Sequence, residues 1–447
     1  MSKKKLGLTM LIALVIGNMI GSGAYLLPST LSTVGSISLY SWIFTCLGAI
    51  SLALVFGRLS SVIPKKGGPY AYTRTGFGNF IGFQTSFCYW VSCWIGNCAI
   101  TVACVAYLKY FFPMLAVPWV SFLTAVAILW FFTLVNTMGV KHVGVIQTVT
   151  VIIKLIPILV VVFLGWFFFH PHYLTESFNV TAKPHLSNLS AISLAATLTL
   201  WGFIGVESAT VPAGNVNNPK KNIARATILG TIVVAVIYLL SSAVVMGMIP
   251  NHVLQSTTAP FAVAATLIFG SVGGVIIAIG AIISCLGALN GWVLLQGQIA
   301  MAAAEDGLFP FAKFFAKKNK NDVPANATIM TSIFITLLLF GTMSSNLVTQ
   351  FNFIILLATS IALFMYFYVA VTSLVLARVK IIKSTITHLV LSLFACVYSF
   401  WAIFSAGQNL IFYELMLLLA TFVIYVAVIA PSKRSLIHPD ELKQDFK

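Results

Sequence analysis

Residues 17–23, Gly-Asn-Met-Ile-Gly-Ser-Gly, interrupt the first long apolar run of the chain near its middle. Residues 201–208, Trp-Gly-Phe-Ile-Gly-Val-Glu-Ser, interrupt the sixth run in the same way. Apolar helices broken by glycine at corresponding positions of two halves are typical of the binding sites of membrane transporters. For either stretch alone, close helix packing explains the spacing of small residues equally well. Their matched positions, five runs apart, favour a transporter site.

The composition of the chain requires a membrane. Of its 447 residues, 60% are hydrophobic and 8% are charged, whereas soluble domains carry about a quarter charged residues. We expect about twelve spans of the roughly 20 residues that cross a bilayer. They are helices, because backbone groups in lipid must be paired within their own segment, and the continuous apolar runs exclude a β-barrel. The approximate spans are 8–32, 38–62, 80–112, 117–138, 143–169, 190–213, 224–249, 271–302, 325–342, 348–376, 386–405 and 409–430.

The formal charge of +16 is a topology signal. All Lys and Arg residues except Lys109, Lys154 and Lys183 fall in the termini or in alternate loops. This asymmetry predicts a multi-pass protein of the cytoplasmic (inner) membrane with both termini in the cytoplasm. The basic charge therefore points to no nucleic acid, although contact with anionic lipid headgroups fits it. The seven cysteines form no CxxC pair, so we expect neither a disulfide framework nor a zinc site.

We expect a single transporter domain over residues 1–447. Its first inverted repeat covers residues 5–170, and its second covers residues 188–377. Because five spans is an odd number, the second repeat enters the membrane from the opposite side. Two additional helices follow at 386–430, and a cytoplasmic tail follows at 431–447.

The two breaks offer unpaired backbone groups to a ligand. The first frees the N–H groups of Ser22 and Gly23 at the start of a half-helix, whose positive dipole end can hold a carboxylate. The second frees the carbonyls of Trp201 and Ile204, which can accept from an α-ammonium group. We therefore expect an amino acid held by its backbone, with its side chain left open. The candidate substrate-binding residues at the breaks are Asn18, Ile20, Gly21, Ser22, Gly23, Trp201 and Ile204.

Glu207 is the only carboxylate, and Lys154 the only basic residue, that we place deep in a span. Ionisable groups inside a membrane are functional candidates by default. For Glu207 the candidate roles are proton carrier, gate partner or local helix lock, and the alternative is a protonated group bonded to a nearby carbonyl. For Lys154 the candidate role is an ammonium facing the broken first helix, and the alternative is snorkelling.

Two tryptophans and an asparagine also lie at mid-membrane depth. Trp201 adjoins the second break, and its ring can hold a cation or cap a pocket; core filling is the alternative, as it is for Trp292. Asn97 needs a partner at this depth, either another helix or the substrate. The chain contains no Ser-His-Asp set, no H-E-x-x-H motif and no phosphate loop, so we predict neither an enzyme nor a bound cofactor or metal.

Several of these residues belong to a recognisable pattern. The matching residues are 17–23 with Leu27-Pro28, Tyr89-Trp90, 93–97, 200–201, 203–209 and Gly291-Trp292, and in loops 218–220, 248–250 and 306–310. They resemble the amino acid–polyamine–organocation superfamily, and within it the basic amino acid/polyamine antiporters, most closely the arginine/agmatine exchangers. The resemblance implies a LeuT-like fold of twelve helices in a 5+5 inverted repeat with discontinuous helices 1 and 6. It also implies alternating access and, commonly, a homodimer.

The resemblance assigns roles to positions of this chain. It implies that Ser22 and Gly23 hold the carboxylate, that Trp201 covers the aliphatic chain and that Trp292 meets a guanidinium group. The residues implied at the distal end of the substrate are Ser92, Cys93, Asn97, Ile100 and Ala358. The residues implied in gating or coupling are Tyr89, Lys154, Glu207 and Tyr366.

We expect the substrates to be small-molecule amino acids and amines, with arginine exchanged for its decarboxylated amine, agmatine. Together with a cytoplasmic decarboxylase, such exchange exports a proton equivalent and provides acid resistance. Three substitutions depart from the arginine pattern: Ala358 replaces a serine, Ala362 a threonine and Ile100 a methionine. Lys154 resembles the fifth-helix lysine of proton-coupled and neutral-exchange branches. The alternatives are therefore a proton-coupled or neutral amino acid transporter or exchanger, an ornithine/putrescine exchanger and a lysine/cadaverine exchanger.

Overall fold

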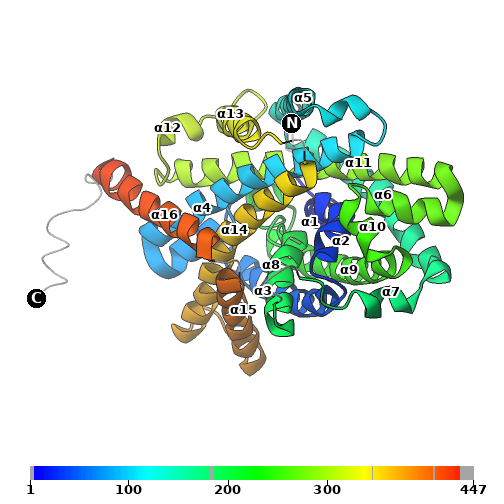
Figure 1. Ribbon diagram of the computed structural model, residues 1–447. Coiled ribbons are helices and arrows are strands. Elements are labelled where there is room, and N and C mark those ends of the chain that lie inside the picture. The colour runs from blue at the N-terminus through cyan, green and yellow to red at the C-terminus, as the bar shows by residue number, and fades with distance from the viewer. Residues whose placement is uncertain (1–4, 182–185, 345, 384, 406–407, 433–447) are drawn as a thin grey trace, which may run out of the picture.

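The computed structural model describes residues 5–181, 186–344, 346–383, 385–405 and 408–432, and these fold almost entirely as helices (Figure 1). Among the described residues, ten helices are long and apolar enough to cross a membrane, and shorter apolar helices at Asn188–Phe203 and Ala325–Gly341 complete twelve spans. The prediction of an all-helical membrane fold of about twelve spans is confirmed.

The first five spans come from the first half of the chain. They are α1 (Leu8–Met19) with α2 (Ser22–Ser32), α3 (Ser38–Val62), α4 (Pro69–Leu108), α5 (Pro118–Thr137) and α6 (Val140–Leu164). Short helices connect or extend them, namely η1 (Pro113–Ala116), η2 (Gly165–Phe168) and α7 (Pro171–Glu176). Proline stands at the first position of α4 and α5, where its missing N–H leaves no intrahelical bond unmade.

The remaining seven spans come from the second half. They are α8 (Asn188–Leu200) with η3 (Trp201–Phe203), α9 (Pro219–Met248), α11 (Pro260–Glu305), α13 (Ala325–Gly341), α14 (Leu347–Arg378), α15 (Ile386–Ser405) and α16 (Gln408–Ile424). The shorter elements are η4 (Ala213–Asn215), α10 (Asn251–Ser256), α12 (Ala312–Phe315), the π-helical turn η5 (Tyr425–Ile429) and α17 (Ala430–Ser432).

Two helices begin well before the predicted spans, because each contains a glycine kink. Helix α4 bends at Gly78, with φ 84° and ψ −170°, and α11 bends at Gly270, with φ 69° and ψ −164°. Only glycine adopts this backbone conformation at little cost. The predicted spans at 80–112 and 271–302 start just after the kinks. Nearly identical kinks at the third span of each half support the proposed inverted repeat.

The sixth span is interrupted more severely than a simple break in a helix. After η3 the chain passes through Gly205, with φ +116°, and continues to η4 as a series of turns. The bonds there join residues three apart, such as Ser208 N to Gly205 O at 2.9 Å and Thr210 N to Glu207 O at 2.7 Å. The predicted span at 190–213 therefore contains an α-helix only in its first part.

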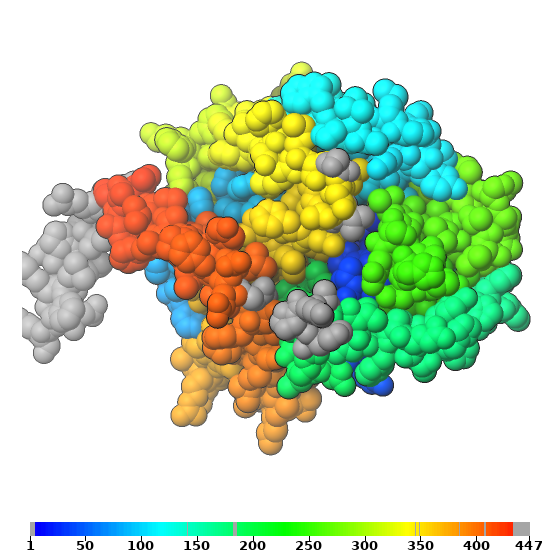
Figure 2. All heavy atoms as spheres, viewed as in Figure 1, coloured from blue at the N-terminus to red at the C-terminus, as the bar shows by residue number. Residues whose placement is uncertain are grey.

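The broken first span lies in the interior, and the last two helices lie at the edge. Figure 1 shows α1 and α2 in dark blue, enclosed by the other helices. Helices α15 and α16 cover one side, and Figure 2 shows their orange and red surface projecting from the body. Helix α16 packs on α4 and α14. The interior position of the first span places both of its free helix ends out of contact with lipid.

Ion pairs join the start of α4 to the end of α11. Arg74 Nη1 lies 2.5 Å from Asp306 Oδ2, and Glu305 pairs with Lys66 at 3.4 Å and with Lys318 at 2.9 Å. The hydrogen bond from Lys318 to Glu305 raises the pKa of this lysine. The cluster lies at the side that the charge pattern assigns to the cytoplasm.

Candidate functional site

The centre of the candidate site is the gap between α1 and α2. Helix α1 ends at Met19, Ile20 and Gly21 are non-helical, and α2 starts at Ser22. The two backbone conformations in the gap are φ −80° with ψ 87° at Ile20 and φ −125° with ψ −125° at Gly21. The gap exposes the last carbonyls of one helix and the first N–H groups of the other.

Lys154 satisfies the carbonyl end of the gap. It is 0% exposed, and its ammonium group donates to the carbonyl of Gly17 at 2.7 Å and to the carbonyl of Ile20. Ser284 Oγ donates to the same Ile20 carbonyl at 3.2 Å. The expectation that Lys154 faces the broken helix is met in the geometry, and snorkelling does not describe it. Its role in coupling stays a prediction.

Asn18 connects the gap to three other segments. Trp292 Nε1 donates to the carbonyl of Asn18 at 3.0 Å. The side chain of Asn18 donates to Ser208 Oγ at 3.0 Å and accepts from Gln147 Nε2 at 3.2 Å. Both broken spans are thereby joined through one amide, so a ligand that shifts Asn18 shifts both.

The N-terminal end of α2 is the part of the gap that has no partners. Gly21 caps this helix without a side-chain hydrogen bond, so the first N–H groups, at Ser22 and Gly23, lack intrahelical partners. Ser22 is 1% exposed, and its Oγ has no hydrogen-bond partner among the described residues. Three donors therefore converge at a helix N-terminus, which is a suitable site for a carboxylate.

A cavity adjoins this end of α2 and encloses about 10 Å³, which admits about one water molecule. The indole ring of Trp201 narrows it: a Cβ atom on Gly23 would lie 3.1 Å from the ring, and one on Gly96 would lie 3.3 Å from it. An amino acid therefore enters only after the surrounding side chains have moved. The lining residues are Asn18, Met19, Gly21, Ser22, Gly23, Ile100, Trp201, Ile204 and Trp292.

The carbonyls of Trp201 and Ile204, which are expected to accept from an α-ammonium group, differ in how many hydrogen bonds they already accept. The N–H of Ile204 donates to the carbonyl of Trp201 at 3.3 Å, which leaves that oxygen one further lone pair. Among the described residues, no group donates to the carbonyl of Ile204. The second break thus supplies one oxygen that already accepts a bond and one that does not.

Glu207 holds three segments together beside the cavity. It is 0% exposed and accepts a hydrogen bond from Tyr89 on α4 and one of 2.7 Å from Tyr366 on α14. The N–H of Gly205 also donates to its carboxylate, at 3.3 Å. This is the geometry of the predicted gate partner or helix lock, and the alternative of a carboxyl group bonded to a carbonyl does not fit.

The residues expected at the distal end of the substrate are only partly brought together. Ile100 lines the cavity, but the other four are engaged elsewhere. Asn97 Nδ2 donates to Gln296 Oε1 at 2.7 Å, and Ser92 Oγ donates to the carbonyl of Ala358 at 2.8 Å. Cys93 is buried. Substrate contact by these four residues requires a wider cavity than the present one.

Sequence reasoning missed the polar side chains that support the gap from neighbouring helices. Tyr238, for example, donates to the carbonyl of Met19 at 2.5 Å. Each stands on a largely apolar helix, and no spacing shows which way it faces. The missed residues at the gap are Gln147, Tyr238 and Ser284, and Gln296, which binds Asn97, was missed as well. Ser208, the partner of Asn18, lies within the second break at 201–208.

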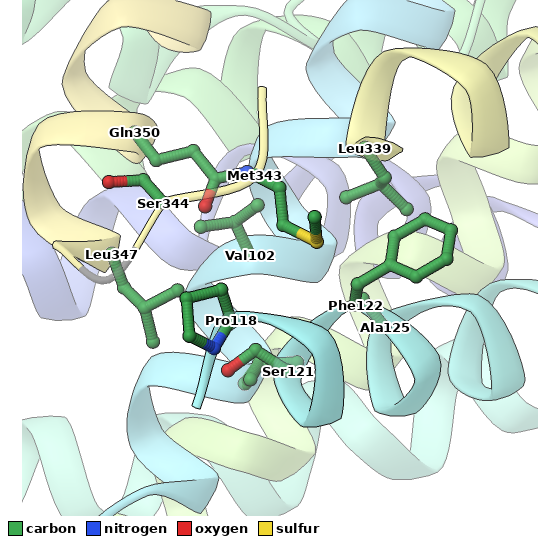
Figure 3. Close-up of a pocket in the computed structure, with 11 residues that line it drawn as sticks. Val102, Pro118, Ser121, Phe122, Ala125, Leu339, Met343, Ser344, Leu347 and Gln350 are labelled. Carbon is green, nitrogen blue, oxygen red and sulfur yellow. The ribbon is translucent and has the colours of Figure 1, made fainter. Parts of the chain in front are cut away.

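A second cavity lies away from the helix gap, among α4, α5, α13 and α14 (Figure 3). Its walls are mainly apolar, with Val102, Phe122 and Met343 among the lining residues. The nearby amide of Gln350 donates to Thr342 Oγ1 at 3.2 Å. Within the described part of the chain, no group of three or more His, Cys, Asp or Glu side chains gathers that could hold a metal.

Comparison with known proteins agrees with this geometry. Residues 6–431 match the amino acid permease family. A cadaverine/lysine antiporter of Escherichia coli (strain K12) is 34% identical over 417 residues, or 91% of each chain. The putrescine transporter PotE is 32% identical in the same organism, over 92% of each chain. Its namesake in Haemophilus influenzae is 33% identical, over 92% of this chain and 93% of that one.

Proposed function

We propose that this chain, which belongs to the amino acid permease family, exchanges a cationic amino acid for its decarboxylated amine by alternating access. Within the amino acid–polyamine–organocation superfamily it belongs to the basic amino acid/polyamine antiporters. The observation that carries the proposal is the buried, unpartnered N-terminal end of α2 beside two tryptophan rings.

The α2 end suits the carboxylate of an amino acid. The N–H groups of Ser22 and Gly23 and the hydroxyl of Ser22 lie at the positive end of a helix dipole. The α-ammonium group would donate to the carbonyl of Ile204. An amine without a carboxylate would occupy the same cavity without the α2 contacts, which is what an exchanger of the two requires.

The distal cation would meet aromatic faces and carbonyl oxygens. Trp201 and Trp292 line the cavity, and tryptophan binds cations over its ring. Glu207 is held by two tyrosines and the N–H of Gly205, so we assign it to the gate and not to the substrate. In the same way we assign Tyr89 and Tyr366 to the gate.

We favour lysine and cadaverine as the substrate pair. One relative of this chain is a cadaverine/lysine antiporter, and two others are putrescine transporters. At position 358 the arginine pattern has a serine that contacts the guanidinium group, and this chain has alanine. The expected pair of arginine and agmatine stays a prediction, as does ornithine with putrescine. Binding measurements distinguish both pairs from lysine and cadaverine.

Proton-coupled uptake is the rival function, because of Lys154. Its ammonium group binds the carbonyls of Gly17 and Ile20 at the end of α1, and loss of its proton would remove the positive charge that strengthens both of these hydrogen bonds. In an exchanger, the same contact would set how readily α1 moves.

We further propose that the protein lies in a bacterial cytoplasmic membrane, with both termini in the cytoplasm, and that it forms a homodimer. The distribution of Lys and Arg supports the orientation, and the bacterial relatives support the location. The two inverted repeats at residues 5–170 and 188–377 are part of the same proposal.

Equilibrium binding to the purified protein tests the substrate class. We expect lysine and cadaverine to bind most tightly, arginine, agmatine, ornithine and putrescine more weakly, and alanine and leucine not measurably. Tighter binding of arginine and agmatine would still support an exchanger, but with arginine and agmatine as its substrates in place of lysine and cadaverine. Comparable binding of leucine would contradict a cationic substrate and favour the neutral alternative.

A further inference from the structure

A second buried carboxylate lies in α16, where sequence reasoning placed none. Glu414 is 1% exposed and stands within the apolar helix Gln408–Ile424. Neither of its carboxylate oxygens has a hydrogen-bond partner among the described residues, and the ion pairs found there do not include it. Sequence reasoning, which placed only Glu207 deep in a span, therefore missed a buried carboxylate in the last span.

The register of three helices places Glu414 in a polar seam between α16, α4 and α14. Further along α16, Thr421 accepts from Gln84 Nε2 at 3.0 Å, and Gln84 Oε1 accepts from Tyr368 on α14 at 2.8 Å. One or two turns away on the same faces stand Glu414, Cys88 on α4 and Ser360 on α14. Cys88 and Ser360 are the seam residues that lie beside the Glu414 carboxyl group.

While its bond to Leu356 is made, Ser360 can only accept from Glu414. Its hydroxyl hydrogen is donated to the carbonyl of Leu356 at 2.9 Å, so the remaining lone pairs of Oγ can accept but its proton is committed. As long as that bond is kept, a hydrogen bond between Ser360 and Glu414 needs a proton on the carboxyl group. An ionised carboxylate at this position would meet neither a donor nor a cation, which is a costly arrangement in a membrane.

We propose that Glu414 is a proton-binding site inside the membrane and that its protonated form donates to Ser360 Oγ, holding α16 against α14. The other titratable groups on the packed elements are few. Those that α4 and α14 contribute to the seam are Cys88 and Tyr368, and the Tyr368 hydroxyl is already donated to Gln84. Helix α15, which also contacts α16, carries His388, Cys396 and Tyr398, and none of them hydrogen-bonds Glu414.

The site lies behind the helices that carry the gate. Helix α4 carries Tyr89, one residue from Cys88, and α14 carries Tyr366, six residues from Ser360. Protonation of Glu414 thus fixes α16 to α14, one of the two gate helices, and loss of the proton loosens that contact. The inference rests on the contacts of Glu414 alone and does not depend on which solute is exchanged.

Infrared difference spectroscopy tests the proton directly. At pH 7, the spectrum of wild-type protein minus that of Glu414→Gln should contain the carbonyl stretching band of one protonated carboxylic acid. The same subtraction with Glu176→Gln, an exposed carboxylate in α7, should not contain it. A difference spectrum with carboxylate bands in place of the acid band would overturn the proposal.

The partner is tested separately. Ser360→Ala removes the acceptor, so the acid band should remain and move to higher frequency, as expected for a weaker hydrogen bond. An unmoved band would overturn the assignment to Ser360. Between pH 5 and pH 7 the melting temperature of wild-type protein should fall relative to that of Glu414→Gln, because over this range the folded wild-type chain keeps a proton that the unfolded chain has released. Equal changes in the two proteins would contradict the site, whatever substrate the protein exchanges.

Discussion

Replacement of Ser22 by alanine separates the two substrates of the proposed exchange. Ser22 Oγ is buried and has no partner in the described structure. The substitution therefore removes no hydrogen bond from the protein without substrate, and folding should be unaffected or slightly favoured. The only contact that it deletes is the one to a bound carboxylate, which lysine has and cadaverine lacks.

The size of the effect follows from that contact. A hydrogen bond to a charged group contributes about 1.5–3 kcal/mol, which corresponds to roughly a 10- to 150-fold loss of affinity. The two backbone N–H groups at the start of α2 remain, so some affinity for the amino acid is retained. We expect lysine to bind 10-fold or more weakly, at about the lower end of this range, and cadaverine to bind as it does to the wild-type protein.

Isothermal titration calorimetry with both ligands is the assay, with the melting temperature measured on the same samples. The control is Ser29→Ala in the same half-helix, because Ser29 Oγ donates to the carbonyl of Thr257 at 2.9 Å and does not line the cavity. Ser29→Ala should leave the ratio of lysine to cadaverine affinities unchanged. Equal losses for both ligands in Ser22→Ala, or no loss for lysine, would refute the assignment of the carboxylate to α2.

Four further substitutions test the other parts of the site. Trp292→Ala should weaken the binding of cationic substrates by roughly 1–2 kcal/mol in the same titrations, and Trp292→Phe, which keeps an aromatic face but loses the N–H bond to Asn18, should weaken it less; unchanged affinity in both would remove the cation–π role. Lys154→Ala should alter exchange rate or its pH dependence in proteoliposomes more than affinity, and wild-type transport at every pH would count against coupling. Glu207→Gln cannot accept both tyrosine bonds and should slow exchange by roughly tenfold, whereas a wild-type rate would exclude a gate role. Ala358→Ser should raise arginine affinity over lysine by about fivefold, and an unchanged ratio would show that this position does not read the guanidinium group.

The breaks were the most predictable part of the molecule. Glycine and polar residues inside an apolar run have few explanations in a membrane, so residues 17–23 and 201–208 marked the gap and its N–H donors correctly. The span boundaries at 80–112 and 271–302 were less predictable. The residues before Gly78 are more polar than the span, those before Gly270 are mostly apolar, and both segments continue as helix in another direction because of the kinks.

The contacts across the gap were not predictable from the chain. Gln147, Tyr238 and Ser284 stand among other polar residues on largely apolar helices, and only the packing of the helices shows that these three face the gap. The burial of Glu414 was not predictable for the same reason. An acidic residue about two turns from the end of a span suggests that the residue lies near the membrane boundary. Its burial depends on α4 and α14, which lie far away in sequence.

Counterflow in proteoliposomes tests the central claim most directly. Vesicles loaded with cadaverine and diluted into labelled lysine should accumulate the label, and vesicles loaded with buffer alone should not, with or without a pH gradient. Ser22→Ala should reduce the uptake of labelled lysine into loaded vesicles far more than the exchange of cadaverine for cadaverine. Uptake of lysine into unloaded vesicles that follows an imposed pH gradient would contradict obligatory exchange and establish the proton-coupled alternative.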